Sequence, residues 1–239
     1  MIVAVPLVGA VACLLIAFLL LRSLGIRYRV GRLLAVAPTA QIEDARELAA
    51  RKPKYVRLSG RISSDEEFPD ENDRPLVFRR KRIEIASANG MWRTIADERE
   101  AVPFGVETRD AFMAVDSAAI GDGLVAIPRE STGKLSDLPA DLLAGVADLP
   151  GPDTPARLVI EQLSAIEHAT VCGTPVLRDG QPIITAGLGR PLVITTLEPP
   201  AAMRLLAAGQ RPRVLAAAAC LGGALVFLGL TLVALIVGF

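Results

Sequence analysis

Residues 76–100 read LVFRRKRIEIASANGMWRTIADERE, and this stretch carries the clearest fold signal in the chain. Leu76–Ala88 is predicted to form one long strand. The Asn89-Gly90 dipeptide that follows is a preferred centre of a two-residue hairpin turn, because both turn positions need a positive φ angle. The return strand contains Trp92 and runs towards Glu100. The stretch therefore predicts a β-hairpin.

Strand-like segments continue on both sides of this hairpin. Tyr55–Ile62 alternates, which places Val56, Leu58, Gly60 and Ile62 on one face. Further short strands are predicted at Val102–Glu107, Ala111–Val115, Leu124–Ile127, Leu158–Leu163, Ala169–Leu177, Pro182–Ala186 and Leu192–Thr196, with a turn at Arg178-Asp179-Gly180. Many short strands with frequent turns are typical of a small sandwich or barrel.

Helices are predicted before, within and after these strands. Thr39 is the expected N-cap of a helix that runs to about Arg51, and Pro200–Ala208 fits a last short helix. A Pro/Gly/Asp-rich stretch at Gly133–Thr154 interrupts the strands, with one short helix near Ala140–Val146. The predicted fold is a mainly β (α+β) soluble domain, a small barrel or sandwich, with an OB-like barrel as one form of it.

The two ends of the chain are apolar. Ile2–Leu21 and Val214–Phe239 contain no charged residue, so all 26 basic and 26 acidic residues lie between them. A helix needs about 20 apolar residues to cross a bilayer. We therefore expect an integral membrane protein with a transmembrane helix at residues 1–22, a basic linker and short helix at 23–54, a β-rich domain at 55–210 and a second transmembrane helix at 213–239.

Arginines flank both apolar segments on the side of the central domain. They are Arg22, Arg27, Arg29 and Arg32 after the first segment, and Arg204, Arg211 and Arg213 before the second. By the positive-inside rule, this distribution predicts a cytoplasmic domain with both termini outside.

Small residues predict that the two apolar helices pack together as a hairpin. The candidate contact residues are Ala218 with Gly222, Ala219 with Gly223, and Gly9 with Ala12 in the first helix. Homo-oligomerisation through the same helices remains open.

The composition argues against several kinds of site. A net charge of zero argues against nucleic-acid binding, which usually needs a basic excess. One histidine, with Cys172 as the single cysteine outside the apolar ends, cannot build a zinc site, and no cofactor is expected. We assign no catalytic residue. His168 and Cys172 are four residues apart on a predicted strand, which separates them by about 13 Å.

The candidate binding residues are Arg79, Lys81 and Trp92. Arg79 and Lys81 belong to the run Arg79-Arg80-Lys81-Arg82, which suits an anionic partner, although a strand divides such a run between two faces. The alternative role of this run is ion pairing with the acidic loop at residues 65–73, expected to be solvated. The alternative role of Trp92 is core packing.

Several short motifs are spread over roughly residues 30–210. They are Ala37-Pro-Thr-Ala-Gln-Ile, Val56-Arg-Leu-Ser-Gly-Arg-Ile, Trp92, Val102-Pro-Phe-Gly-Val-Glu, Ala114-Val-Asp116, Ile160-Glu-Gln-Leu, Ala169-Thr-Val-Cys-Gly and Pro191-Leu-Val-Ile-Thr. Together these motifs resemble the GIDE/BAM-type domain of membrane-anchored mitochondrial E3 ubiquitin ligases. The resemblance includes two flanking spans, and it implies a partner-engaging domain between them. A RING supplies catalysis in those ligases, and the three cysteines of this sequence cannot build one, so the chain looks more like the RING-less prokaryotic relatives.

We therefore expect a membrane-anchored, non-catalytic interaction or scaffold module. Its partners would be the lipid bilayer and an unidentified protein or peptide, with no nucleic acid. One alternative is a transferase or hydrolase related to E3 ubiquitin ligase activity, with Cys172 as the nucleophile. A second is an OB-like nucleic-acid binder, which would need aromatic platforms in a basic groove.

Overall fold

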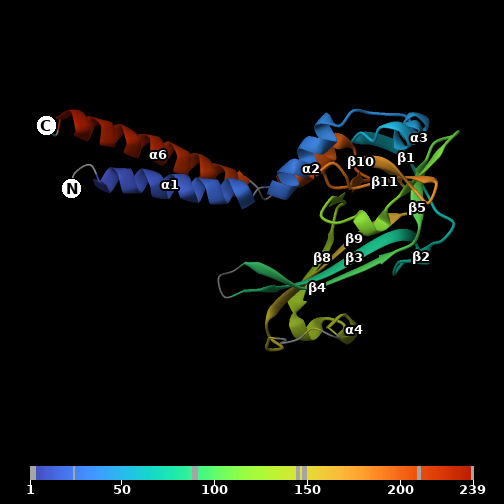
Figure 1. Ribbon diagram of the computed structural model, residues 1–239. Coiled ribbons are helices and arrows are strands. Elements are labelled where there is room, and N and C mark those ends of the chain that lie inside the picture. Colours follow the sequence, from blue (N-terminus) through green and yellow to red (C-terminus); the bar gives the residue numbers. More distant parts are fainter. Residues whose placement is uncertain are drawn as a thin grey trace. The chain divides into compact units, whose positions relative to one another are not determined.

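The computed structural model describes residues 4–23, 25–87, 91–143, 146, 150–208 and 211–237 (Figure 1). The structure is mixed α/β, with 38% strand and 35% helix. The chain divides into two compact units. One, which we call the helical unit, combines Met1–Ala35 with Met203–Phe239, and the other, which we call the β unit, is Val36–Ala202.

The helices α1 (Ala4–Ser23) and α6 (Arg211–Val237) lie side by side and run in opposite directions within the helical unit (Figure 1). α2 (Gly25–Val36) follows α1, so the predicted basic linker is helical over Gly25–Val36. The inner face of α2 carries Val30 and Leu34, which are four residues apart and fully buried.

The contact between α1 and α6 is lined by small residues seven apart. They are Ala10 and Ala17 on α1, and Ala217 and Ala224 on α6, all buried. This spacing keeps the small residues on one seam of each helix. Gly9 lies at the contact as expected, since a Cβ there would lie 3.3 Å from the Phe227 ring.

Of the expected contact residues on α6, only Gly223 is confirmed. Ala218, Ala219 and Gly222 are exposed, and so is Ala12 on α1, whereas Gly223 approaches Cys13. The seven-residue spacing explains the difference, because it selects Ala217 and Ala224 rather than their neighbours.

The apolar parts of these two helices differ in length. Val214–Val233 in α6 is long and apolar enough to cross a membrane. The apolar part of α1 within the described residues is Pro6–Leu21, which is shorter. By length and composition, the described residues thus contain one candidate membrane span, with a shorter apolar helix packed along it.

Within the described residues, the larger sheet of the β unit has seven strands. They are β1 (Val56–Ser63), β5 (Phe104–Glu107), β6 (Phe112–Val115), β11 (Gln181–Thr185), β10 (His168–Arg178), β12 (Val193–Thr195) and β7 (Leu124–Val125), in this spatial order. β1 also pairs with β10, so the pairing β1-β5-β6-β11-β10 returns to β1. Within this cycle only β6 and β11 are parallel. The sheet is therefore partly curled.

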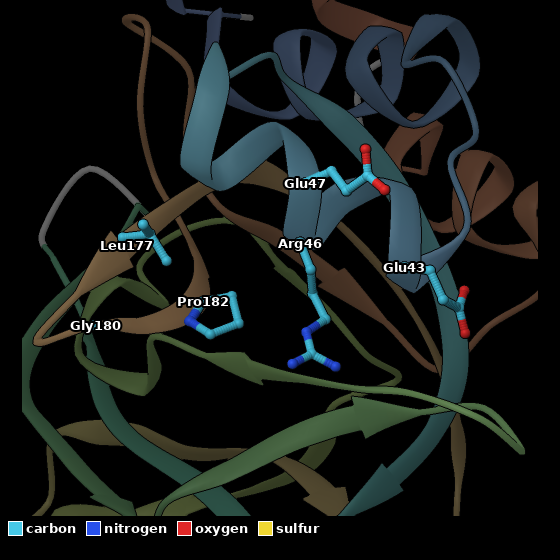
Figure 2. A pocket seen from close by; sticks show the side chains of 6 residues that line it. All are labelled: Glu43, Arg46, Glu47, Leu177, Gly180 and Pro182. Atoms are coloured by element: carbon cyan, nitrogen blue, oxygen red, sulfur yellow. The ribbon is translucent and has the colours of Figure 1, made fainter.

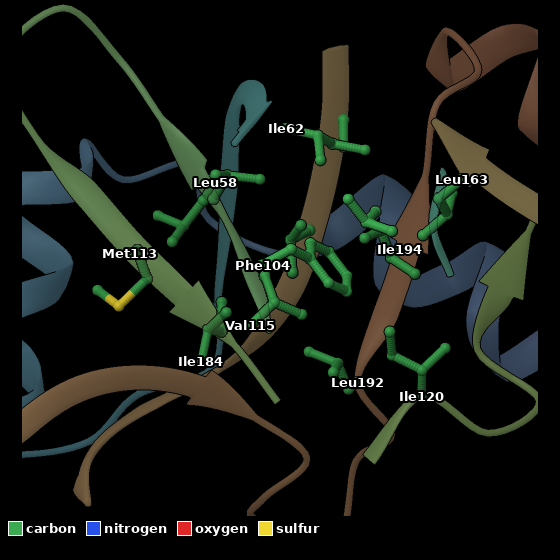
Figure 3. Packing of buried hydrophobic residues seen from close by; sticks show 14 of the residues in the cluster. Leu58, Ile62, Phe104, Met113, Val115, Ile120, Leu163, Ile184, Leu192 and Ile194 are labelled. Carbon is green, nitrogen blue, oxygen red and sulfur yellow. The ribbon is translucent and has the colours of Figure 1, made fainter. Parts of the chain in front are cut away.

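The main core of the β unit lies inside this curled sheet (Figure 3). Leu58 and Ile62 from β1 meet Met113 from β6 and Ile184 from β11, all fully buried. α3 (Ile42–Arg51) adds Ile42 and Ala45 to the same core. The alternation read from Tyr55–Ile62 is confirmed, because every second residue of β1 from Val56 is buried.

The second sheet is built from two long insertions in the first. β2 (Phe68–Pro69), β3 (Pro75–Ala86) and β4 (Trp92–Ala101) lie between β1 and β5, while β8 (Arg129–Lys134) and β9 (Pro155–Ser164) lie between β7 and β10. β3 is central, with β4 on one side and β9 then β8 on the other, and β2 pairs with the start of β3. A small core of Ile85, Leu135 and Ala156 lies on one face, near the short helices η2 (Leu135–Asp137) and α4 (Ala140–Leu143). The last short helices are η1 (Ser117–Ala119) and α5 (Pro199–Ala207).

The predicted hairpin is confirmed by the antiparallel pairing of β3 with β4, while Asn89-Gly90 lies outside the described residues. The turn at Arg178-Asp179-Gly180 is also confirmed, with positive φ angles of 52° at Asp179 and 77° at Gly180. Asn, Asp and Gly are the residues that tolerate this conformation.

Two expectations for the β unit were wrong. Thr39 is not the cap of α3, because Gln41 precedes the helix and Thr39 instead bridges to Arg57 of β1. No strand was predicted at β8, and its last two residues, Gly133 and Lys134, were placed in the stretch expected to interrupt the strands. Its sequence RESTGK is polar throughout and every residue is exposed, so it lacks the alternation by which a half-buried strand is recognised.

Candidate functional site

The strand β4 forms an open edge of the second sheet. It is ten residues long, it pairs with β3 on one side, and none of its residues is buried. No other described strand pairs with it. The backbone N–H and C=O groups along its outer side are therefore available to another chain, which is the usual basis of strand addition.

A bulge divides β4 into two parts. Ile83 pairs with Ala96 but Glu84 pairs with Thr94, so Ile95 is an extra residue on β4. Ile95 packs against the small core of this sheet. An extra residue increases the local twist and changes which side chains share a face.

One face of this sheet carries a bidentate ion pair between β3 and β4. Nε of Arg80 donates to Oδ1 of Asp97 at 2.8 Å, and its Nη2 donates to Oδ2 at 2.7 Å. The Arg80 side chain is only 8% exposed, and Asp122 lies 3.5 Å from it on the other side. These hydrogen bonds, with a further one from Nη2 of Arg99 to Oδ2 at 3.3 Å, lower the pKa of Asp97 to about 2.

Further ion pairs continue across the same face. Arg82 of β3 pairs with Glu161 of β9 at 3.3 Å, and Arg157 of β9 pairs with Glu84 of β3 at 2.6 Å. The Nε atom of Arg82 is buried without a hydrogen-bond partner among the described residues. The signs alternate across neighbouring strands, so the face attracts neither purely acidic nor purely basic ligands.

Trp92 lies at the start of β4, on the edge. Its side chain is 40% exposed, and the Arg157 guanidinium lies 4.6 Å from its ring centroid. The neighbouring Met91 is more exposed still. The alternative role of Trp92 in core packing is therefore wrong, because this end of the hairpin lies outside both hydrophobic cores.

Arg79 and Lys81 lie on the opposite face from Arg80 and Arg82, as the strand period requires. Arg79 pairs with Glu100 of β4 and lies over the Phe68 ring at 5.2 Å. Arg79 and Lys81 therefore lie on one face of the sheet, and the contact between Trp92 and Arg157 lies on the other.

The arginine run does form ion pairs, but its partners come from β4, β9 and Asp122 rather than from the acidic loop. Within that loop Asp70 is buried instead of solvated. Its Oδ1 accepts hydrogen bonds from the backbone N–H groups of Asn72 at 2.7 Å and Arg74 at 2.9 Å. These bonds fold the loop back on itself as an Asx turn.

Cys172 and His168 do not form a catalytic pair. Cys172 is fully buried in β10, and this burial raises the pKa of its thiol to about 12. His168 is exposed at the start of the same strand. A thiolate is the reactive form of cysteine, so the environment of Cys172 opposes nucleophilic chemistry.

A shallow hollow of about 440 Å³ lies between α3 and the turn that joins β10 to β11 (Figure 2). Its lining residues are Glu43, Arg46, Glu47, Leu177, Gly180 and Pro182. This hollow was not predicted from the sequence, because α3 ends at Arg51 and the turn begins at Arg178, far along the chain. Two acids and one base around a short apolar floor define neither a catalytic group nor a metal site.

The described residues contain no group of three or more His, Cys, Asp or Glu side chains that could hold a metal ion. The chain matches no family model, no curated protein and no solved structure. The open edge of β4, with Trp92 at one end, is thus the strongest candidate site in the part of the chain that the structure describes.

Proposed function

We propose that this chain is a membrane-anchored, non-catalytic interaction module that binds an extended segment of a partner protein along β4. The observation that carries the proposal is the ten-residue open edge of this strand. A segment added there gains main-chain hydrogen bonds, and side chains at alternate positions provide selectivity. The strand β8 is a second exposed edge, but it has six residues and no aromatic side chain.

The side chains of β4 indicate the chemistry of the partner segment. Trp92 and Met91 offer exposed apolar surface at one end, and tryptophan is enriched among residues that dominate binding energy. Glu98, further along, is exposed and forms no ion pair with any described residue. A fitting segment has an apolar residue opposite Trp92 and a basic residue opposite Glu98.

We extend the proposal to anchoring by both α1 and α6. The candidate span in α6 and the packing of α1 along it support this arrangement. Residues 2–5 add uncharged sequence before Pro6, which brings the first apolar segment close to the required length. The seven flanking arginines support a cytoplasmic β unit with both termini outside.

The pairing order of the larger sheet supports an OB-like barrel within the β unit. Numbered along the chain, its five cyclic strands follow the order 1-2-3-5-4 and close back on strand 1. A five-stranded Greek-key barrel is the form of the OB-fold. A GIDE/BAM-type relationship remains part of this proposal, with the β unit as the partner-engaging domain and no RING.

Nucleic-acid binding, which also uses OB-folds, is less well supported. The β unit contains all 26 acidic residues of the chain and only 19 of its 26 basic residues. A surface with this balance repels phosphate backbones.

The test is selection of binding peptides by the full chain in detergent. A phage-displayed library of random 12-residue peptides is the probe, and the bound site is mapped by hydrogen exchange. We expect selected peptides to contain an apolar and a basic residue and to protect the amides of β4. Trp92→Ala and Glu98→Lys should each weaken binding at least tenfold, while Glu71→Lys, the same charge change in the exposed loop, should not. Protection at β8 or at the hollow beside α3, or no enrichment, would refute the proposal.

A further inference from the structure

The charges of the chain are strongly segregated between its two units. Residues 1–42 and 199–239 contain seven arginines and no aspartate, glutamate or lysine. The helical unit therefore carries a charge of +7 from its side chains, while the β unit carries the compensating excess of acid. No carboxylate side chain exists within the helical unit to neutralise these arginines.

Two of these arginines lie on the exposed side of α2. Arg29 and Arg32 are exposed, and neither forms an ion pair with a described residue. Tyr28, on the same side of the helix, is 75% exposed. The inner side is fixed by packing, since a Cβ at Gly31 would lie 3.4 Å from the sulfur of Met203. Because the inner side of α2 is packed, Arg29 and Arg32 lie on its outer side.

A third exposed arginine comes from the other end of the sequence. Arg204 lies in α5, one residue after Met203, and it too has no ion-pair partner among the described residues. The contact of Gly31 with Met203 therefore joins the two basic segments within the helical unit.

Chain geometry keeps these groups near the end of α1. α1 ends at Ser23 and α2 begins at Gly25. The Cα of Arg32 is therefore at most about 18 Å from that of Ser23, from a rise of about 1.5 Å per residue in α2 and up to about 3.6 Å per residue across the link. The lipid headgroup region is about 5–8 Å thick, and the electrostatic attraction of the membrane extends about one Debye length, about 8 Å, beyond it. Together these two lengths are similar to the distance from Ser23 to Arg32.

We infer that the exposed arginines Arg29 and Arg32 of α2 and Arg204 of α5 form a basic surface of the helical unit that binds the phosphates of anionic phospholipids. The site lies at the membrane surface where the apolar helices begin and end, and the inference rests on the membrane anchoring proposed above. Guanidinium groups bind phosphate in a bidentate manner, and no carboxylate side chain of the helical unit competes with it. Tyr28 adds an amphipathic ring of the kind enriched at membrane surfaces.

The experiment uses the full chain reconstituted in vesicles of equal phosphatidylglycerol and phosphatidylcholine. After extraction in a mild detergent and purification, the retained headgroups are counted by mass spectrometry. The test variant is Arg29→Gln/Arg32→Gln/Arg204→Gln. The matched control is Arg51→Gln/Arg61→Gln/Arg109→Gln, which removes three exposed arginines from the β unit outside β4.

We expect the wild-type chain to retain more phosphatidylglycerol than phosphatidylcholine, and this enrichment to fall at least fivefold in the test variant, since each basic residue near a membrane contributes about that factor. The control should keep the wild-type enrichment, and 0.5 M salt during purification should reduce it. Equal retention of both lipids, an unchanged test variant, or an acidic protein or nucleic acid retained in place of lipid would overturn the inference. Extraction of the wild-type chain by alkaline carbonate would instead refute the anchoring, because that treatment removes only proteins that do not span the bilayer.

Discussion

Replacement of Asp97 by asparagine tests whether the ion pair with Arg80 stabilises the second sheet. The change removes the charge that faces Arg80 and keeps a side chain of nearly the same shape. Arg80 is almost fully buried, so it loses its main counter-charge without gaining water. Asp122, 3.5 Å away, remains as a weaker partner.

The magnitude follows from the pKa of Asp97. Its ordinary value is 3.8, and the hydrogen bonds from Arg80 and, to a smaller extent, from Arg99 lower it to about 2, a difference equivalent to about 2.5 kcal/mol. The carboxylate is 31% exposed, so solvent screening reduces this contribution. We expect Asp97→Asn to lower the free energy of unfolding by about 1–2 kcal/mol at pH 7. This is below the roughly 3–5 kcal/mol for breaking a fully buried pair, because Asp122 still neutralises part of the Arg80 charge.

The pH dependence has a defined direction. Because the pKa of Asp97 is lower in the folded state, folding favours its ionised form, and its contribution is fully present above about pH 4–5. As pH falls from 4 towards 2 the unfolded state binds the proton first, and the contribution is lost. The difference in stability between wild type and Asp97→Asn should therefore shrink over this interval.

The assay is urea unfolding of the full chain in detergent, followed by the fluorescence of Trp92. This is the only tryptophan, and its ring contacts Arg157 in the same sheet, so its signal reports the structure in question. Asp65→Asn, in the exposed part of the acidic loop, is the matched control and should change stability by less than about 0.5 kcal/mol. An Asp97→Asn variant as stable as wild type at pH 7, or a difference that persists at pH 2, would refute the reasoning.

Three further predictions use cysteine chemistry in chains whose other cysteines are replaced. Gly9→Cys with Phe227→Cys should form a disulfide on mild oxidation, because a Cβ at Gly9 lies 3.3 Å from the Phe227 ring, and electrophoretic mobility reports it; the exposed pair Ala12→Cys with Gly222→Cys is the control. Cys172, kept as the single cysteine, should react with a maleimide at least a hundredfold more slowly in the folded chain than in urea. The reason is that the thiol is buried and has a pKa of about 12. Rapid labelling of the folded chain would contradict this prediction. Glu66→Cys, in the exposed part of the acidic loop, should be labelled by a membrane-impermeant thiol reagent only after cell lysis, whereas labelling of intact cells would reverse the proposed orientation.

Local pattern was sufficient to predict much of the β unit. The alternation of Tyr55–Ile62 and the two turn signals required only neighbouring residues, and the strands they predict are present. β8 was missed because an edge strand exposed on both faces has no apolar alternation to detect. Its existence depends on pairing with β9, more than 20 residues further along the chain.

The candidate site was only partly predictable for a similar reason. Trp92 could be placed at the start of a return strand, but no local feature shows that this end of the hairpin lacks a covering element. The partners of the arginine run were also hidden. A nearby acidic loop was the obvious choice from sequence, whereas Glu161 is opposite Arg80 and pairs with Arg82 through strand register alone.

The pairing of β1 with β10 has a consequence during synthesis. Leu58 pairs with Val171, so one neighbour of β1 is made more than 110 residues after it. At about 5–20 residues per second, the ribosome needs roughly 5–20 seconds to reach β10. During that interval the apolar face of β1 and the β3–β4 hairpin have left the ribosome while the strands that complete both sheets do not yet exist. During this interval the nascent chain exposes apolar strand surface, and this is when we expect it to bind a chaperone.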